Sequence, residues 1–210
     1  MMRSIHAARW LVVAVGLSLV AACGGGASVT EVGGDAPVGF QRVTNSGAGF
    51  SMVVPSGWEI VDASEVDADE IVAAGASAFP ELADMSDEMT AALAQGVIFW
   101  AFDFESGSAD FVDNINVIKA PRQGASAEAL RDLNLAQLRQ VATNVTAAIE
   151  TSLQGYEVVV MEYSLPAYGL IGIGALVLTS DTQWVITLVA SSRNPLDFEF
   201  DTVIDLFREA

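Results

Sequence analysis

Three apolar segments rich in β-branched residues follow one another near the end of the chain, at residues 156–165, 168–180 and 184–192. Valine, isoleucine, threonine and tyrosine suit the pleated surface of a sheet, and the clusters of turn residues between the segments mark where strands stop. The turn SDTQ joins the last two segments. The sequence therefore predicts an antiparallel sheet.

The first half of the chain supplies further strands of the same kind. The stretch FQRVTNSGAGFSMVVPSGWEIVD, from residue 40, predicts two short strands around a turn and a third extended piece through Ile60. Pro55 ends the second strand, because proline cannot donate to a ladder. Residues 97–104 and 111–119 form a hairpin. The first of these is apolar on both faces in its opening half, which places it inside the sheet.

Two helices are expected in the second half of the chain. Ser126 is placed to cap a helix that runs to about residue 143. Asn194 is the N-cap and Pro195 the first residue of a closing helix. Apolar side chains recur at helical spacing in both: Leu130, Leu133, Leu138 and Val141, then Phe200, Val203, Ile204 and Phe207. The sum is an α+β fold, an antiparallel β-sheet of about six strands flanked by helices, in a single domain over residues 40–210.

Residues 62–95 show an irregular helical pattern that ends at Gly96. This segment opens with a run of acids, DASEVDADE. Carboxylates are the ligands that calcium and manganese prefer, but the run lacks the glycine and terminal glutamate of a calcium loop. A solvated helix face is the simpler interpretation, and no metal is expected.

The only cysteine of the chain, Cys23, lies in VGLSLVAACGGGAS. Arg3 and Arg9 precede an uncharged stretch over residues 10–22, which spans ~20 Å as a helix. That length suits a secretory signal peptide rather than a membrane span. A disulfide would need a second cysteine, a metal site more ligands and a catalytic thiolate a nearby base. VAAC is similar to the lipobox of bacterial lipoproteins, which implies a signal peptide over 1–22 and lipidation of Cys23.

The glycine-rich residues 23–39 then predict a flexible tether. The resemblance to lipoproteins places the protein at the cell membrane, held on the extracytoplasmic face by acyl chains such as palmitate on Cys23. The domain is expected to be a monomer that hangs a short distance from the membrane.

The charge balance narrows the function further. The chain has 9 Lys and Arg against 27 Asp and Glu, a net charge of −18. Such a chain repels phosphate backbones, which excludes nucleic acid as a partner. The acidity reflects either solubility or an acidic docking face for a basic partner. The only histidine, His6, leaves with the signal peptide, so the commonest general base is missing. We expect no enzyme activity and no cofactor.

Four stretches carry a family resemblance, in order over residues 40–208: GFSMVVPSGWEI, FVDNINVIKA, LQGYEVVVMEYSL and WVITLVASS with FDTVIDLFR. They resemble the PsbP-like fold family, with its F-x-φ-x-x-P-x-x-W opening (φ, apolar) and its N-φ-N-V strand. Among lipid-anchored members the chain is similar to the LpqN-type lipoproteins of actinobacteria. The resemblance implies an α/β/α sandwich. It also implies an accessory role, because members of this fold mostly bind other proteins.

Two groups of residues are candidates for a binding site within the domain. Trp58 and Trp100 are either core or part of an apolar cavity wall. Asn114 and Asn116 point to one side of their strand, as a polar face or as partners for buried backbone groups. The glycines of GLIGIG precede a strand rather than a helix, so they face a bulky ring across the sheet instead of a phosphate.

The sequence therefore favours a lipid-anchored, non-catalytic binding module for envelope proteins. The alternative is a carrier that holds an apolar ligand or lipid between sheet and helices.

Overall fold

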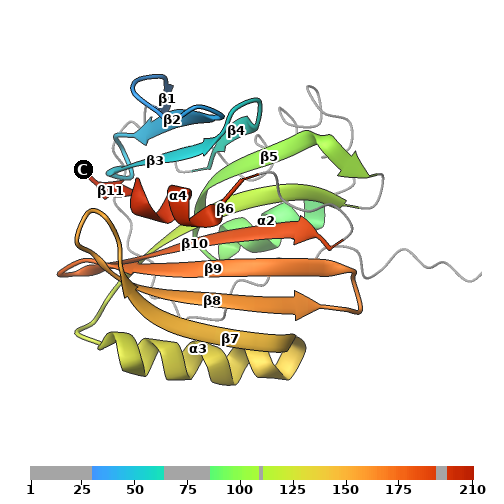
Figure 1. Ribbon diagram of the computed structural model, residues 1–210, viewed down its shortest axis with the longest axis vertical. Coiled ribbons are helices and arrows are strands. Elements are labelled where there is room, and N and C mark those ends of the chain that lie inside the picture. Colours follow the sequence, from blue (N-terminus) through green and yellow to red (C-terminus); the bar gives the residue numbers. More distant parts are fainter. Residues whose placement is uncertain (1–29, 64–85, 109–110, 193–197) are drawn as a thin grey trace, which may run out of the picture.

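The computed structural model describes residues 30–63, 86–108, 111–192 and 198–210 (Figure 1). The described chain is mostly β, with one seven-stranded and one four-stranded sheet and three helices. All strand pairs are antiparallel, as the sequence predicts. No helix in these ranges is long and apolar enough to cross a membrane.

The large sheet forms the middle of the molecule. Its strands are, in spatial order, β4 (Glu59–Asp62), β5 (Val97–Ser108), β6 (Phe111–Pro121), β10 (Thr182–Ser191), β9 (Leu170–Leu178), β8 (Glu157–Leu165) and β7 (Thr143–Thr151). The predicted hairpin of β5 and β6 is confirmed, and β5 lies inside the sheet between β4 and β6.

The small sheet is built from both ends of the described chain. Its strands are β1 (Thr30–Val32), β2 (Phe40–Asn45), β3 (Phe50–Pro55) and β11 (Arg208–Glu209). β1 falls within residues 23–39, which the sequence predicts to be a flexible tether. This part of the prediction needs correction, because Thr30–Val32 pair with β2 and the N–H of Gly33 donates to the carbonyl of Arg42 over 2.9 Å.

Three helices accompany the sheets: α2 (Ser86–Ala94), α3 (Ala127–Val141) and α4 (Phe200–Asp205). Gly96 follows α2 with φ of 88°, the left-handed conformation of a helix stop. The hydroxyl of Ser126 accepts the N–H of Ala129 over 3.3 Å, which confirms the predicted cap of α3. α4 begins only at Phe200, later than predicted. The predicted start at Asn194 and Pro195 lies outside the described residues.

Both faces of the central strands of the large sheet are buried. On one face, here the α3 side, α2 packs on β5 and α3 packs on β7 and β8. On the other face, the α4 side, lie α4 and the small sheet (Figure 1). Successive residues of a strand point to opposite faces, so Ile115 and Val117 of β6 enter the core on the α4 side while Ile118 enters the core on the α3 side. The flanking layers are therefore not both helical, as a simple α/β/α sandwich would have them.

Two details differ from the predicted pattern. The sheet has a seventh strand, β7, which carries too few large apolar side chains to stand out. In α3, Leu133 and Val141 are 48% and 54% exposed, whereas Asn134 is buried. The Asn134 amide donates to the carbonyl of Leu130 over 2.7 Å, which lets a polar side chain face the sheet.

One of the GLIGIG glycines is required by the packing. Gly172 lies opposite Tyr163 on β8, and a Cβ at this position would collide with the tyrosine ring. This confirms the prediction that a glycine faces a bulky ring.

We expect Gly172→Ala to lower the free energy of unfolding by about 1–3 kcal/mol, because the tyrosine ring cannot move away inside a packed core. The matched control is Gly174→Ala, for which the nearest atom is Met161 Cε at an ordinary 3.7 Å. Urea unfolding of both variants checks this. Equal losses for the two would contradict the close approach at Gly172.

Candidate functional site

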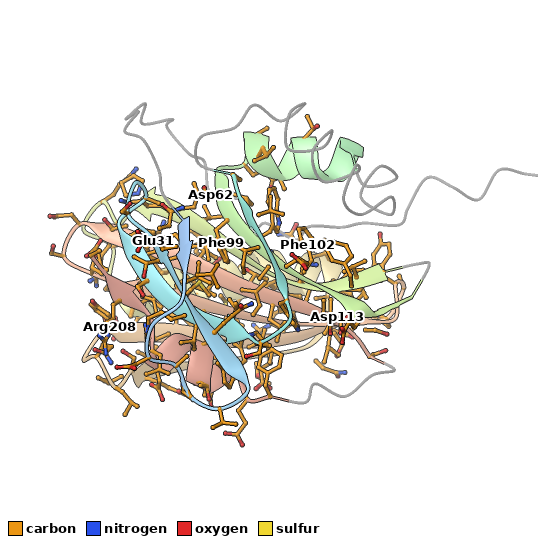
Figure 2. All side chains as sticks on the ribbon, turned by 90° about the horizontal axis from the view of Figure 1, so that it is seen from above. Glu31, Asp62, Phe99, Phe102, Asp113 and Arg208 are labelled. Carbon is orange, nitrogen blue, oxygen red and sulfur yellow. The ribbon has the colours of Figure 1, made fainter. Side chains whose placement is uncertain are left out.

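Three of the four residues singled out in the sequence converge on the α3 side of the large sheet. Trp100 of β5 is directly opposite Asn116 of β6, and Phe102 is opposite Asn114. Residues that pair directly across antiparallel strands lie on the same face. Phe102 and Phe99, both labelled in Figure 2, belong to the two opposite cores.

On the same face, the cross-strand neighbours of Asn116 and Asn114 on β10, β9 and β8 include small and polar residues. Asn116 is opposite Thr187 of β10, and Thr187 is opposite Gly174 of β9. Two residues before Asn116 on β6, Asn114 is opposite Val189 of β10. Val189 is opposite Gly172 of β9, and Gly172 is opposite Tyr163 of β8. We call Asn114, Asn116, Thr187 and Tyr163 the polar strip. It crosses the central strands between the parts of this face on which α2 and α3 pack.

The polar strip is buried and contains an unpaired hydroxyl group. Tyr163 is 4% exposed, and its hydroxyl has no hydrogen-bond partner. The Asn114 amide donates to the carbonyl of Val112 over 3.2 Å. Asn116 and Thr187 are also buried residues. Most buried polar groups are paired, so the unpaired Tyr163 hydroxyl is unusual.

Burial raises the pKa of the Tyr163 hydroxyl well above its usual range. The hydroxyl is therefore protonated at every physiological pH and is available as a hydrogen-bond donor. Sequence analysis missed Tyr163 and Thr187. The available signal was a polar residue inside an apolar strand, at WVITLVASS and EVVVMEYSL.

Trp58 does not join this group. It packs on the α4 side, where its ring meets that of Phe198 edge-on with centroids 5.6 Å apart. Its carbonyl accepts the side-chain amide of Gln41 over 2.8 Å. Trp58 therefore joins the small sheet to the segment just before α4 and lies across the large sheet from Trp100.

A second candidate is an uncovered area on the α4 side. α4 packs on β3 and β9. The hydrophobic core of this side includes only Val158 and the partly buried Val160 from β8 and no residue from β7. Figure 1 shows the β7 end of this face without an element in front of it. We call this area the open face. Its exposed or half-exposed side chains are Thr146, Ala148, Glu150, Val160, Glu162, Ser164, Ile171 and Ile173.

The open face carries only negative charge. Glu150 and Glu162 are exposed, and the chain has no lysine or arginine between Arg139 and Arg193. At its border, Asp201 of α4 is exposed. The Asp205 carboxylate accepts the N–H of Leu153 over 2.9 Å, which ties the β7–β8 turn to α4. Leu153 itself is 77% exposed. The area therefore combines apolar patches with an acidic rim.

Two acids on neighbouring strands form a third candidate. Asp113 of β6 is directly opposite Asp103 of β5, and its carboxylate accepts the N–H of Ser191 over 2.8 Å. Burial raises the pKa of Asp113. The Ser191 hydrogen bond opposes this rise, and the negative charge of Asp103 adds to it.

Other predicted features cannot be placed. Cys23 and most of the acidic run over residues 62–70 lie outside the described residues. Within the described ranges, no group of three or more potential ligands could hold a metal ion.

The sequence and the structure were each compared with known proteins. No family model matches the sequence, and no curated protein matches it. The chain is structurally similar to the solution structure of cyanobacterial PsbP (CyanoP) from Synechocystis sp. PCC 6803, a PsbP-like fold. The TM-score is 0.46 at 15% identity, over 85% of this chain and 98% of that one.

Asp113 allows a test of the buried acid. Its pKa is raised in the folded state, so ionising it opposes folding, and the free energy of unfolding falls as the pH rises through that pKa. Asp113→Asn keeps an acceptor for Ser191. We expect its stability relative to the wild type to increase as the pH rises from about 4 toward 7. Urea unfolding at several pH values measures this. A constant difference would refute the raised pKa.

Proposed function

We propose that this protein is a lipid-anchored, non-catalytic binding module that docks a basic envelope protein through the open face. The uncovered, acidic half of the α4 side is the observation that carries this proposal. A sheet face normally buries its apolar side chains against a second layer. Among the described residues the second layer does not extend over β7, and Val160, Ile171 and Ile173 are partly exposed beside acidic groups.

Charge complementarity defines the partner. Glu150 and Glu162 lie on the same face as Val160 and Ile173, and β7, β8 and β9 carry no basic side chain that would neutralise them. A partner surface with lysine or arginine around an apolar patch would be attracted and correctly oriented. Leu153, exposed at the β7–β8 turn, offers an apolar anchor at one end of the face.

The location follows from the N-terminal sequence. VAAC with the preceding signal peptide supports lipidation of Cys23, and the net charge of −18 makes a purely electrostatic hold on anionic lipids untenable. The finer assignment to LpqN-type lipoproteins is part of this proposal and rests on the sequence motifs. The domain would act as a monomer on the extracytoplasmic face of the membrane, without nucleic acid or cofactor.

Cys23→Ser should move the protein from the membrane fraction to the soluble fraction, because the acyl chains supply the membrane affinity. Fractionation of cells that produce the wild type or the variant measures this. Ser56→Ala, a substitution at an exposed serine in the domain, is the control and should remain at the membrane. Retention of Cys23→Ser at the membrane would refute the anchor while leaving the docking proposal intact.

Docking is tested with a photo-crosslinking residue at Ala148 on the open face and, as control, at Leu133 on the exposed side of α3. In membranes, we expect the crosslinker at position 148 to capture a single basic protein and the crosslinker at position 133 to capture none. The double change Glu150→Gln and Glu162→Gln should weaken its binding about three- to tenfold at low salt, since exposed ion pairs are each weak.

The matched control for charge is Glu31→Gln with Glu105→Gln, two exposed acids on other elements. This pair removes the same charge and should leave binding unchanged. Equal weakening by the two double variants would show that net charge, not the open face, attracts the partner. Crosslinking of one protein from Leu133 would place the interface on the other side of the sheet.

A further inference from the structure

We propose that the polar strip on the α3 side binds an uncharged apolar molecule through a carbonyl oxygen. This inference concerns the opposite face of the sheet from the docking surface and does not depend on it. It begins with the Tyr163 hydroxyl, which is buried without a hydrogen-bond partner on the face of the sheet that also carries Asn114, Asn116 and Thr187.

The geometry of the strip gathers donors. The Tyr163 ring lies over Gly172, so its hydroxyl extends from β8 across β9. Thr187 of β10 and Asn116 of β6 are paired directly across their strands and lie on the same face as Tyr163. Hydroxyl and amide groups can all donate, and an oxygen with two lone pairs can accept two such bonds. A carbonyl oxygen is the complementary group.

The strands that carry the polar strip have no positive charge on this face, which argues against an anionic ligand. On β5, β6, β8, β9 and β10 the only basic side chain is Lys119. Lys119 lies on the α4 side, where it donates to the carbonyl of Ala48 over 2.7 Å and sits 4.7 Å from the centre of the Trp184 ring. A carboxylate or phosphate at the strip would be buried without a counter-charge, which is strongly unfavourable.

The surroundings of the strip define the rest of the ligand as apolar. Trp100 and Phe102 of β5 stack with their centroids 6.3 Å apart next to the asparagines. Met161 borders the strip from β8, with a flexible thioether side chain that adapts to different shapes. Both an acyl ester and a quinone have this chemistry, an apolar body with an uncharged carbonyl.

The probes are 1-palmitoylglycerol labelled with ¹³C at its carbonyl and decylubiquinone, with palmitate at neutral pH as the charged comparison. Equilibrium dialysis measures binding to the full chain carrying Cys23→Ser, so that no attached lipid competes. We expect one uncharged probe to bind at one site and palmitate to bind at least tenfold more weakly. The infrared stretch of the labelled carbonyl should move to lower frequency on binding. Which probe binds distinguishes an ester from a quinone.

Tyr163→Phe separates a ligand contact from a structural one. Removing an unpartnered buried hydroxyl should leave the Tm unchanged or raise it. Loss of one donor should weaken probe binding about five- to tenfold. Asn116→Leu should weaken binding similarly. The control is Tyr156→Phe, whose hydroxyl accepts the N–H of Glu209 over 3.2 Å on the α4 side. It should lower the Tm without changing probe binding.

Three results would overturn the proposal. One is the failure of both uncharged probes to bind. Another is wild-type affinity in Tyr163→Phe. The last is a lower Tm in Tyr163→Phe, which would show that the hydroxyl has an internal partner such as an ordered water.

Discussion

The two-sided burial of the central strands is the constraint on which the rest of the structure depends. Every residue of β10 from Gln183 to Ala190 is buried. Trp184, Ile186 and Leu188 point to the α4 side, and Val185 and Val189 to the α3 side. A strand that is apolar on both faces needs a layer on each. The small sheet with α4 supplies one layer, and α2 and α3 contribute to the other.

The two layers cover the sheet to different extents, and we relate each difference to a proposed binding site. On the α4 side the layer is narrower than the sheet, which leaves β7 and β8 with an exposed acidic surface. On the α3 side the sheet is buried but includes the polar strip, in which the Tyr163 hydroxyl has no hydrogen-bond partner. A partner on the open face and a ligand at the strip would occupy opposite faces of the same strands. Binding at one need not exclude binding at the other.

Much of the fold could be predicted because strong local signals mark it. β5 and β6 stand out by their apolar residues, and α3 by the capping Ser126. β7 was missed because Val145 and Ile149 are the only large apolar side chains in Thr143–Thr151. The site was predicted in part. The alternation of β6 places Asn114 and Asn116 together, but Trp58 lies across the sheet from Trp100.

The sequence by itself determined where most strands and helices lie, which residues face together within one strand, and the acidity of the chain. These are properties of residues near one another along the chain, where spacing and turn chemistry decide the outcome. Only the tertiary structure decided that Tyr163 and Thr187 lie on one face with Asn116, and that no described element covers the β7 end of the sheet on the α4 side. Both depend on the register and layering of segments far apart in sequence, which no local pattern specifies.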